Sequence, residues 1–87
     1  MRTDAKTSFS RDIKKISPVL QDEVYRIIEI VENAKTLQDI PELKKMRASN
    51  TAYRIRIRKY RIGIIIDNDI VVFDRCLPRK DFYKYFP

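Results

Sequence analysis

The chain has 87 residues, 44% of them hydrophobic, and a formal net charge of +7. This length supports one domain, residues 1–87, with a small core. The absence of histidine and the single cysteine, Cys76, exclude an internal disulfide and catalysis by Ser-His or Cys-His pairs, and they predict no metal or cofactor. There is no apolar run of the roughly 18 residues that a membrane span needs, and no apolar segment of a secretory signal, so we expect a cytoplasmic protein without membrane contact.

The first predicted helix follows a polar start. Residues 2–7 offer almost nothing to bury and predict at most a weak strand. Helical spacing then begins, with Ser8 as the expected N-cap. The apolar positions of this short helix are Phe9, Ile13 and Ile16.

A second helix begins almost at once, because Ser17-Pro18 ends the first and starts the next. Ser17 suits the N-cap and Pro18 the first helical position. Apolar residues continue at helical spacing to about Ala34. We expect an antiparallel helical hairpin that packs on a sheet.

The rest of the chain predicts strands. Residues 36–41 form a loop with one helical turn at most, and from Leu43 the apolar period changes to alternation. Short strands are expected at residues 43–47, 53–58, 60–67 and 70–75, with a turn at 67–69. Residues 79–86 predict a short turn or helix whose aromatic side chains cover one end of the sheet.

Positive charge is concentrated in one part of the chain. Residues 43–66 hold eight cations and no acid, so with a total of +7 the remainder carries −1. At the centre, arginines alternate with apolar residues in the order Tyr53-Arg54-Ile55-Arg56-Ile57-Arg58. Alternation on a strand places the arginines in a row on one face, roughly 6–7 Å apart, which suits a polyanion. Gly63 follows Arg61 on that face and indicates either close approach of a ligand backbone or a bulge.

Three motifs resemble those of the RelE/ParE superfamily of toxins. Tyr53–Ile57 followed by Tyr60-Arg61-Ile62 is similar to the family's Y-[RK]-[IL]-[RK]-[ILV] and Y-R-[ILV] pair. Residues 79–83, Arg-Lys-Asp-Phe-Tyr, resemble its C-terminal R-x-x-x-Y, and Phe9–Ile16 resembles its F-x-K-D-L-K-K-L opening. The last five residues look most like archaeal-type RelE members.

The resemblance implies an α+β fold, with a helical hairpin on a small, twisted, mainly antiparallel sheet and a short C-terminal turn or helix. It implies the toxin of a type II toxin–antitoxin system, an mRNA interferase that enters the ribosomal A site, cuts mRNA and inhibits translation. The implied partners are an acidic antitoxin, mRNA and 16S rRNA.

The resemblance also implies roles for single residues. Arg61 would hold the transition-state phosphate, Arg79 would stabilise charge near the leaving group, and Tyr83 would orient or stack on the substrate. Arg54 and Arg56 stand where active relatives carry lysine, and they suit a phosphate clamp. Further RNA contacts are expected from six other basic residues of these segments, Lys44, Lys45, Arg58, Lys59, Lys80 and Lys84.

The general base is unassigned in the sequence. Arginine, with a reference pKa of about 12.5–13.8, does not accept a proton at neutral pH, and Pro78 stands where some relatives carry a histidine. The remaining candidates are Lys59, Lys80, Asp81, Tyr83 and Lys84. Neighbouring positive charge favours loss of a proton, which makes Tyr83 or Lys84 the preferred choice.

Two other functions stay open. The missing base favours an inhibitor of DNA gyrase of the ParE type, whereas the retained Arg79 and Tyr83 pair argues against it. The third alternative is a catalytically weak RelE homologue that acts as a binding module for an antitoxin or RNA.

Overall fold

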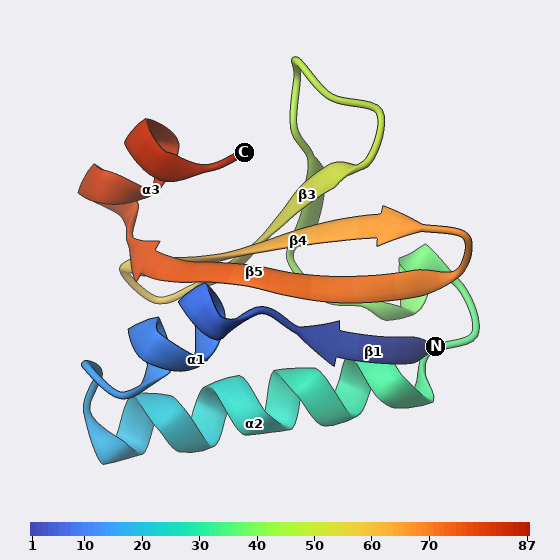
Figure 1. The fold of residues 1–87 in the computed structure, drawn as a ribbon. Helices are drawn as coiled ribbons and strands as arrows, with labels where there is room; N and C mark the ends of the chain where they lie inside the picture. Colours follow the sequence, from blue (N-terminus) through green and yellow to red (C-terminus); the bar gives the residue numbers. More distant parts are fainter.

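The structure, a computed structural model, describes all 87 residues. Figure 1 shows the elements in chain order. They are β1 (Arg2–Ala5), α1 (Thr7–Ile13), α2 (Pro18–Asn33), a 3-10 turn (Leu37–Asp39), β2 (Leu43–Lys45), β3 (Ala52–Ile57), β4 (Tyr60–Asp67), β5 (Ile70–Pro78) and α3 (Arg79–Tyr85).

One mixed sheet organises these elements. Its strand order is β1-β5-β4-β3-β2, with every neighbouring pair antiparallel except β1 and β5, which are parallel. The helices α1 and α2 lie on one side of the sheet and α3 lies on the other (Figure 1). The predicted α+β fold with a helical hairpin and a mainly antiparallel sheet is therefore confirmed. No helix is both long and apolar enough to cross a membrane.

The polar N-terminus does form a strand. Arg2–Ala5 pairs in register with Ile70–Phe73, and the backbone N–H of Lys6 donates to the Phe73 carbonyl at 2.9 Å. The side chains of β1 are mostly exposed. Backbone hydrogen bonds to β5 require no apolar side chains at an edge position, which is why hydrophobicity gave only a weak signal for β1.

The two predicted N-caps have different outcomes. Ser17 caps α2 as predicted, because its hydroxyl accepts from the Leu20 N–H at 3.2 Å. The prediction for Ser8 was wrong, since Lys6 holds the N-cap position of α1. The Ser8 hydroxyl instead donates to the Asp74 carbonyl at 2.8 Å and so joins α1 to β5.

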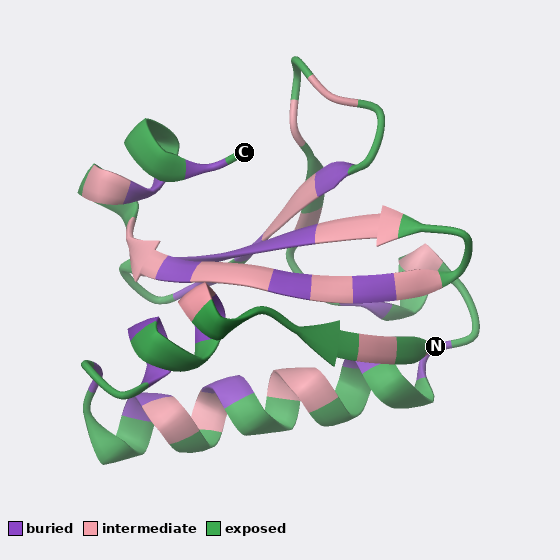
Figure 2. Cartoon of the chain, in the orientation of Figure 1, coloured by how far each residue is buried: buried purple, intermediate pink, exposed green.

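The main core lies between the sheet and the helices α1 and α2. Alternate residues of β3, β4 and β5 face it, and Figure 2 shows the buried positions recurring along these strands. Val24 of α2, Ile62 and Ile64 of β4, and Val71 of β5 are fully buried. The inward face of β3 carries Tyr53, Ile55 and Ile57 as the alternation predicted. The opposite face of the strand is thereby left to the arginines.

A second, smaller cluster holds α3 on the other face of the sheet. Phe82 and Phe86 pack there with Ala52, whereas Tyr85 is 61% exposed and does not cover the sheet. A Cβ at Gly63 would lie 2.6 Å from the ring of Phe86. The register of β4 also shifts between Gly63 and Ile64, which agrees with the bulge, one of the two alternatives that the sequence left open for Gly63. The space beside Gly63 holds Phe86, so no ligand backbone approaches there.

A partly buried ion pair joins α1 to the C-terminal half of β5. Asp12 accepts from Arg75 Nε at 2.8 Å, from Arg75 Nη2 at 3.2 Å and from the Cys76 N–H at 2.9 Å. The Arg75 guanidinium also lies 5.8 Å from the centre of the Tyr85 ring, which brings α3 into the same set of contacts. Burial, followed by the charge of Asp12, raises the pKa of the Cys76 thiol to about 12.

We expect Gly63→Ala to lower the free energy of unfolding by about 1–3 kcal/mol, because the added methyl group overlaps the Phe86 ring. Urea titration of the variant measures this loss. The matched control is the same substitution in a Phe86→Ala background, where the overlap is gone. An equal loss in both backgrounds would show that the Phe86 ring is not the cause.

We expect the Cys76 thiol to resist alkylation at pH 8 in the folded protein. The thiolate is the reactive form, and it is populated only as the pH rises to the raised pKa. Denaturant exposes the thiol and restores its ordinary reactivity. Mass spectrometry after iodoacetamide treatment, with and without denaturant, measures this difference, and complete labelling of the folded protein would contradict it.

Candidate functional site

An open groove of about 1190 Å³ lies where the β3–β4 turn meets the start of α3. The backbone joins these two parts directly, since the Arg79 N–H donates to the Lys59 carbonyl at 2.7 Å. Six of the ten lining residues are cations and one is an acid, so the groove suits an anionic ligand. The lining residues are Glu42, Arg56, Arg58, Lys59, Tyr60, Arg61, Pro78, Arg79, Lys80 and Tyr83.

Strand pairing determines which arginines share this face. In the β3–β4 register, Arg56 is paired with Arg61 and Arg54 with Gly63. Opposite residues on paired strands point to the same face, with Cβ atoms roughly 4.5–5.5 Å apart. Arg54 and Arg56 of the predicted row therefore share a face with Arg61. The prediction was wrong for Arg58, which lies in the turn after β3 and pairs with Glu23 of α2.

Arg61 is the only buried cation, with a relative exposure of 8%. Its Nη1 donates to the carbonyls of Arg58 at 3.1 Å and Tyr60 at 2.9 Å, which fixes the guanidinium against the β3–β4 turn. Its buried Nε has no hydrogen-bond partner. A buried donor without a partner costs about 1–3 kcal/mol and calls for a functional explanation. An anion in the groove would compensate the charge of this guanidinium.

Glu42 is the lining residue that the sequence did not indicate. Arg56 Nη2 donates to its two carboxylate oxygens at 2.8 and 3.0 Å, and Arg54 Nη1 donates to its carbonyl at 2.9 Å. The hydrogen bond and charge of Arg56, and then the charges of Arg54 and Arg61, lower the pKa of Glu42. The sequence carries no local signal for this contact, because Glu42 comes beside Arg56 only through the pairing of Leu43 with Ile55.

The turn residues Arg58 and Lys59 form an exposed rim of the groove. Arg58 has a φ of 54°, in the left-handed region. Its side chain pairs with Glu23 of α2, with Nε at 2.9 Å from both carboxylate oxygens. The rim is thereby attached to the helical layer as well as to the sheet.

Tyr83 stands on α3 with 54% of its surface exposed. Its ring meets the buried Phe82 ring edge-on at 5.1 Å, so one side is supported by the packed cluster under α3. An exposed, supported aromatic ring suits stacking on an unpaired base. Tyr83 is positioned for this by the same cluster that holds Phe86 near Gly63.

The other predicted residues divide into two groups. Lys44, Lys45 and Arg54 line a neighbouring hollow of about 300 Å³, which also includes Tyr83. Lys84 and Asp81 lie on α3 but line neither the groove nor this hollow. Of the candidates for the general base, the groove therefore includes Lys59, Lys80 and Tyr83.

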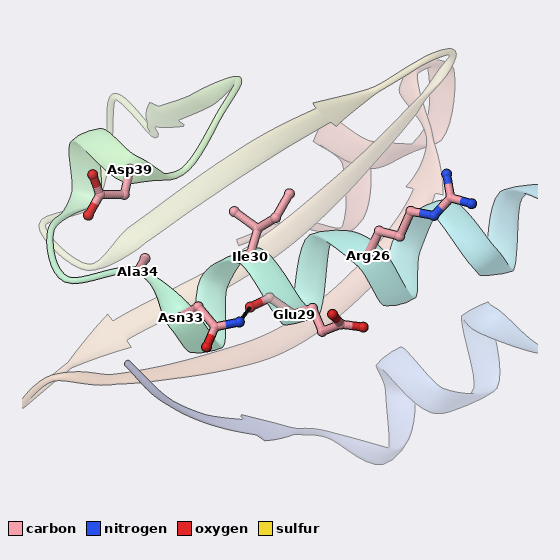
Figure 3. Close-up of a pocket in the computed structure, with 6 residues that line it drawn as sticks. All are labelled: Arg26, Glu29, Ile30, Asn33, Ala34 and Asp39. Atoms are coloured by element: carbon pink, nitrogen blue, oxygen red, sulfur yellow. Dashed lines mark hydrogen bonds between the residues drawn. The ribbon is translucent and has the colours of Figure 1, made fainter.

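A separate hollow of about 510 Å³ lies along α2 and faces Asp39 (Figure 3). Arg26 is its one cation, and Glu29 and Asp39 add two negative charges. Asn33 Nδ2 donates to the Glu29 carbonyl at 3.1 Å within it. The mixed charge gives no basis for binding a polyanion, so the groove remains the candidate site.

The fold and the groove together define a small α+β protein with a basic groove built from a β-hairpin and a C-terminal helix. No protein-family model matches the chain. Toxin RelE3 of Methanocaldococcus jannaschii is 39% identical over 84 residues, which cover 95% of this chain and 94% of the relative. The chain therefore belongs to the RelE toxin family.

Solved structures agree with this assignment. The RelB–RelE antitoxin–toxin complex from Methanococcus jannaschii contains a chain that matches with a TM-score of 0.83 and 33% identity, over 97% of this chain and 99% of that one. The archaeal RelE–RelB complex from Pyrococcus horikoshii matches with a TM-score of 0.74 at 13% identity, over 90% and 93% of the two chains. The second likeness shows the shared fold alone.

Proposed function

We propose that this chain is a ribosome-dependent mRNA endoribonuclease, the toxin of a type II toxin–antitoxin system, and that it cleaves RNA without a metal ion. The observation that carries the proposal is the buried Arg61, held against the β3–β4 turn at a groove lined by five further cations. Cations fixed in advance around one position stabilise charge that develops on a phosphate in the transition state.

The reaction uses the substrate's own 2′-hydroxyl. Its oxygen forms a bond to the adjacent phosphorus as the bond to the 5′-oxygen breaks, which leaves a cyclic phosphate and a free 5′-hydroxyl. The proton of the 2′-hydroxyl passes to a base, and the leaving oxygen gains one. The negative charge on the phosphate oxygens is greatest in the transition state, and the cations of the groove stabilise that charge.

Each part of the groove suits one of these tasks. Arg61 holds the phosphate from the sheet, and Arg79 stabilises the leaving group from the start of α3. Tyr83 stacks on or orients the substrate from the exposed face of α3. Arg56 adds a second guanidinium beside Arg61, where two such groups can bind different oxygens of one phosphate.

Three of the candidates for the general base that the sequence offered line the groove, namely Tyr83, Lys59 and Lys80. A positioned base contributes about 10²–10⁴-fold to such a reaction. Electrostatic stabilisation by the arginines is independent of that step, so slow cleavage is expected even where proton removal depends on water.

The proposed partners follow from the relatives and from charge. A related toxin was solved in complex with a RelB antitoxin, and the net charge of +7 suits an acidic antitoxin. On the ribosome, mRNA in the A site would enter the groove. Lys44, Lys45 and the neighbouring hollow offer contacts to 16S rRNA. A cytoplasmic location accords with these partners.

We expect wild-type protein in a translation extract to create new 5′ ends within translated codons, as detected by primer extension. Arg79→Ala should lower the cleavage rate by about 10²–10³-fold, because one donor to the transition state is lost. Arg61→Lys should also lower it, since lysine keeps the charge but not the fork of donors.

Arg26→Ala is the matched control, because this arginine lies on α2 beside the separate hollow (Figure 3). Its cleavage rate should equal that of wild type. Absence of cuts with folded wild-type protein would refute the proposal. Inhibition of gyrase supercoiling under the same conditions would then favour the ParE-type function.

A further inference from the structure

Glu42 places a negative charge inside a groove otherwise built for anions. It is the single acid among the ten lining residues. Its carboxylate takes two hydrogen bonds from Arg56 Nη2, at 2.8 and 3.0 Å, and its carbonyl takes one from Arg54 Nη1 at 2.9 Å. One residue therefore occupies donors of both arginines of the β3 row that suit a phosphate clamp.

The backbone at this position supports the arrangement. Glu42 has a φ of 60°, in the left-handed region that side chains rarely adopt. The Arg56 N–H also donates to its carbonyl, at 3.2 Å. A rare conformation persists only where its surroundings determine it. The contacts that residue 42 makes here are with Arg54 and Arg56.

The charge of Glu42 is permanent under physiological conditions. Its hydrogen bond with Arg56, and the charges of three arginines, lower its pKa, so the carboxylate remains ionised at neutral pH. A carboxylate that holds protons weakly is a poor proton acceptor. It is, however, an effective counter-ion for the guanidinium beside it.

The ion pair is also easily exchanged. The side chains of Arg56 and Glu42 are 52% and 51% exposed. An ion pair open to water is weak, so a phosphate held close by other contacts can replace the carboxylate at Arg56. A phosphate with few other contacts must compete with a carboxylate that is always present.

We propose that Glu42 is a built-in competitor for RNA phosphate that determines specificity for RNA presented on the ribosome over RNA free in solution. This inference rests on the proposed function. In the free protein the carboxylate occupies Arg56 and lowers the affinity of the groove for RNA. Where the ribosome holds the message in place, the phosphate displaces the carboxylate and gains Arg56.

Binding of a fully 2′-O-methylated single-stranded RNA oligonucleotide tests this, because the probe cannot be cleaved. We expect Glu42→Gln to bind it about 3- to 10-fold more tightly than wild type, as measured by fluorescence anisotropy. The slope of log affinity against log salt should steepen by about 0.7, the value for one further phosphate contact with a single strand.

Glu29→Gln is the matched control, with the same change in charge on the outer side of α2 (Figure 3). It should change affinity less than about twofold, because only long-range attraction is altered. Equal affinities of wild type and Glu42→Gln, or equal gains in the two variants, would overturn the inference.

Measuring the rate of mRNA cleavage on translating ribosomes tests the proposed function separately from the role of Glu42. Glu42→Gln should raise the rate of cleavage of free RNA relative to that of translated mRNA by about 3- to 10-fold. A loss of about 10²–10⁴-fold with unchanged probe binding would make Glu42 the general base instead and would overturn the competitor role. A wild-type protein that does not cleave translated mRNA refutes the proposed function, whereas the binding comparison stands independently of that result.

Discussion

The antiparallel register of β3 and β4 is the constraint on which the groove depends. It pairs Arg56 with Arg61 on one face and leaves the opposite face of β3 to apolar residues that pack on α2. A shift by one residue would turn every side chain of β3 to the other face, burying the arginines and exposing the core residues. Burying unpaired charge is costly, so the alternative register is unstable. Because the apolar side chains of β3 must face the core, the arginines must point to the opposite face.

The second requirement is that α3 stays against the sheet, because it supplies Arg79 and Tyr83. Three kinds of contact hold it there. The Arg79 N–H bonds to the Lys59 carbonyl, Phe82 and Phe86 pack on the sheet, and Arg75 lies near the Tyr85 ring. These contacts involve the β3–β4 turn, the face of the sheet and β5. The groove therefore forms only when the β3–β4 hairpin, β5 and α3 are all folded.

The sequence predicted the strands and helices where the local pattern was strong. Alternation identified β3, and Ser17 identified the start of α2. It failed where the deciding interaction was non-local: β1 forms through backbone bonds to β5, and Ser8 bonds to Asp74 instead of capping α1. Glu42 was missed because its role appears only when β2 and β3 are paired. The motifs indicated Arg61, but only the structure shows that its guanidinium is buried and has an unpartnered Nε.

The contact between Gly63 and Phe86 makes two distant positions interdependent during evolution. No side chain fits at position 63 while a phenyl ring occupies the space above it, so either position limits what the other accepts. Among homologues, a larger residue at position 63 should accompany a smaller one at position 86, with α3 seated differently on the sheet. Variation at this pair would therefore alter how α3, with Arg79 and Tyr83, lies against the β3–β4 hairpin.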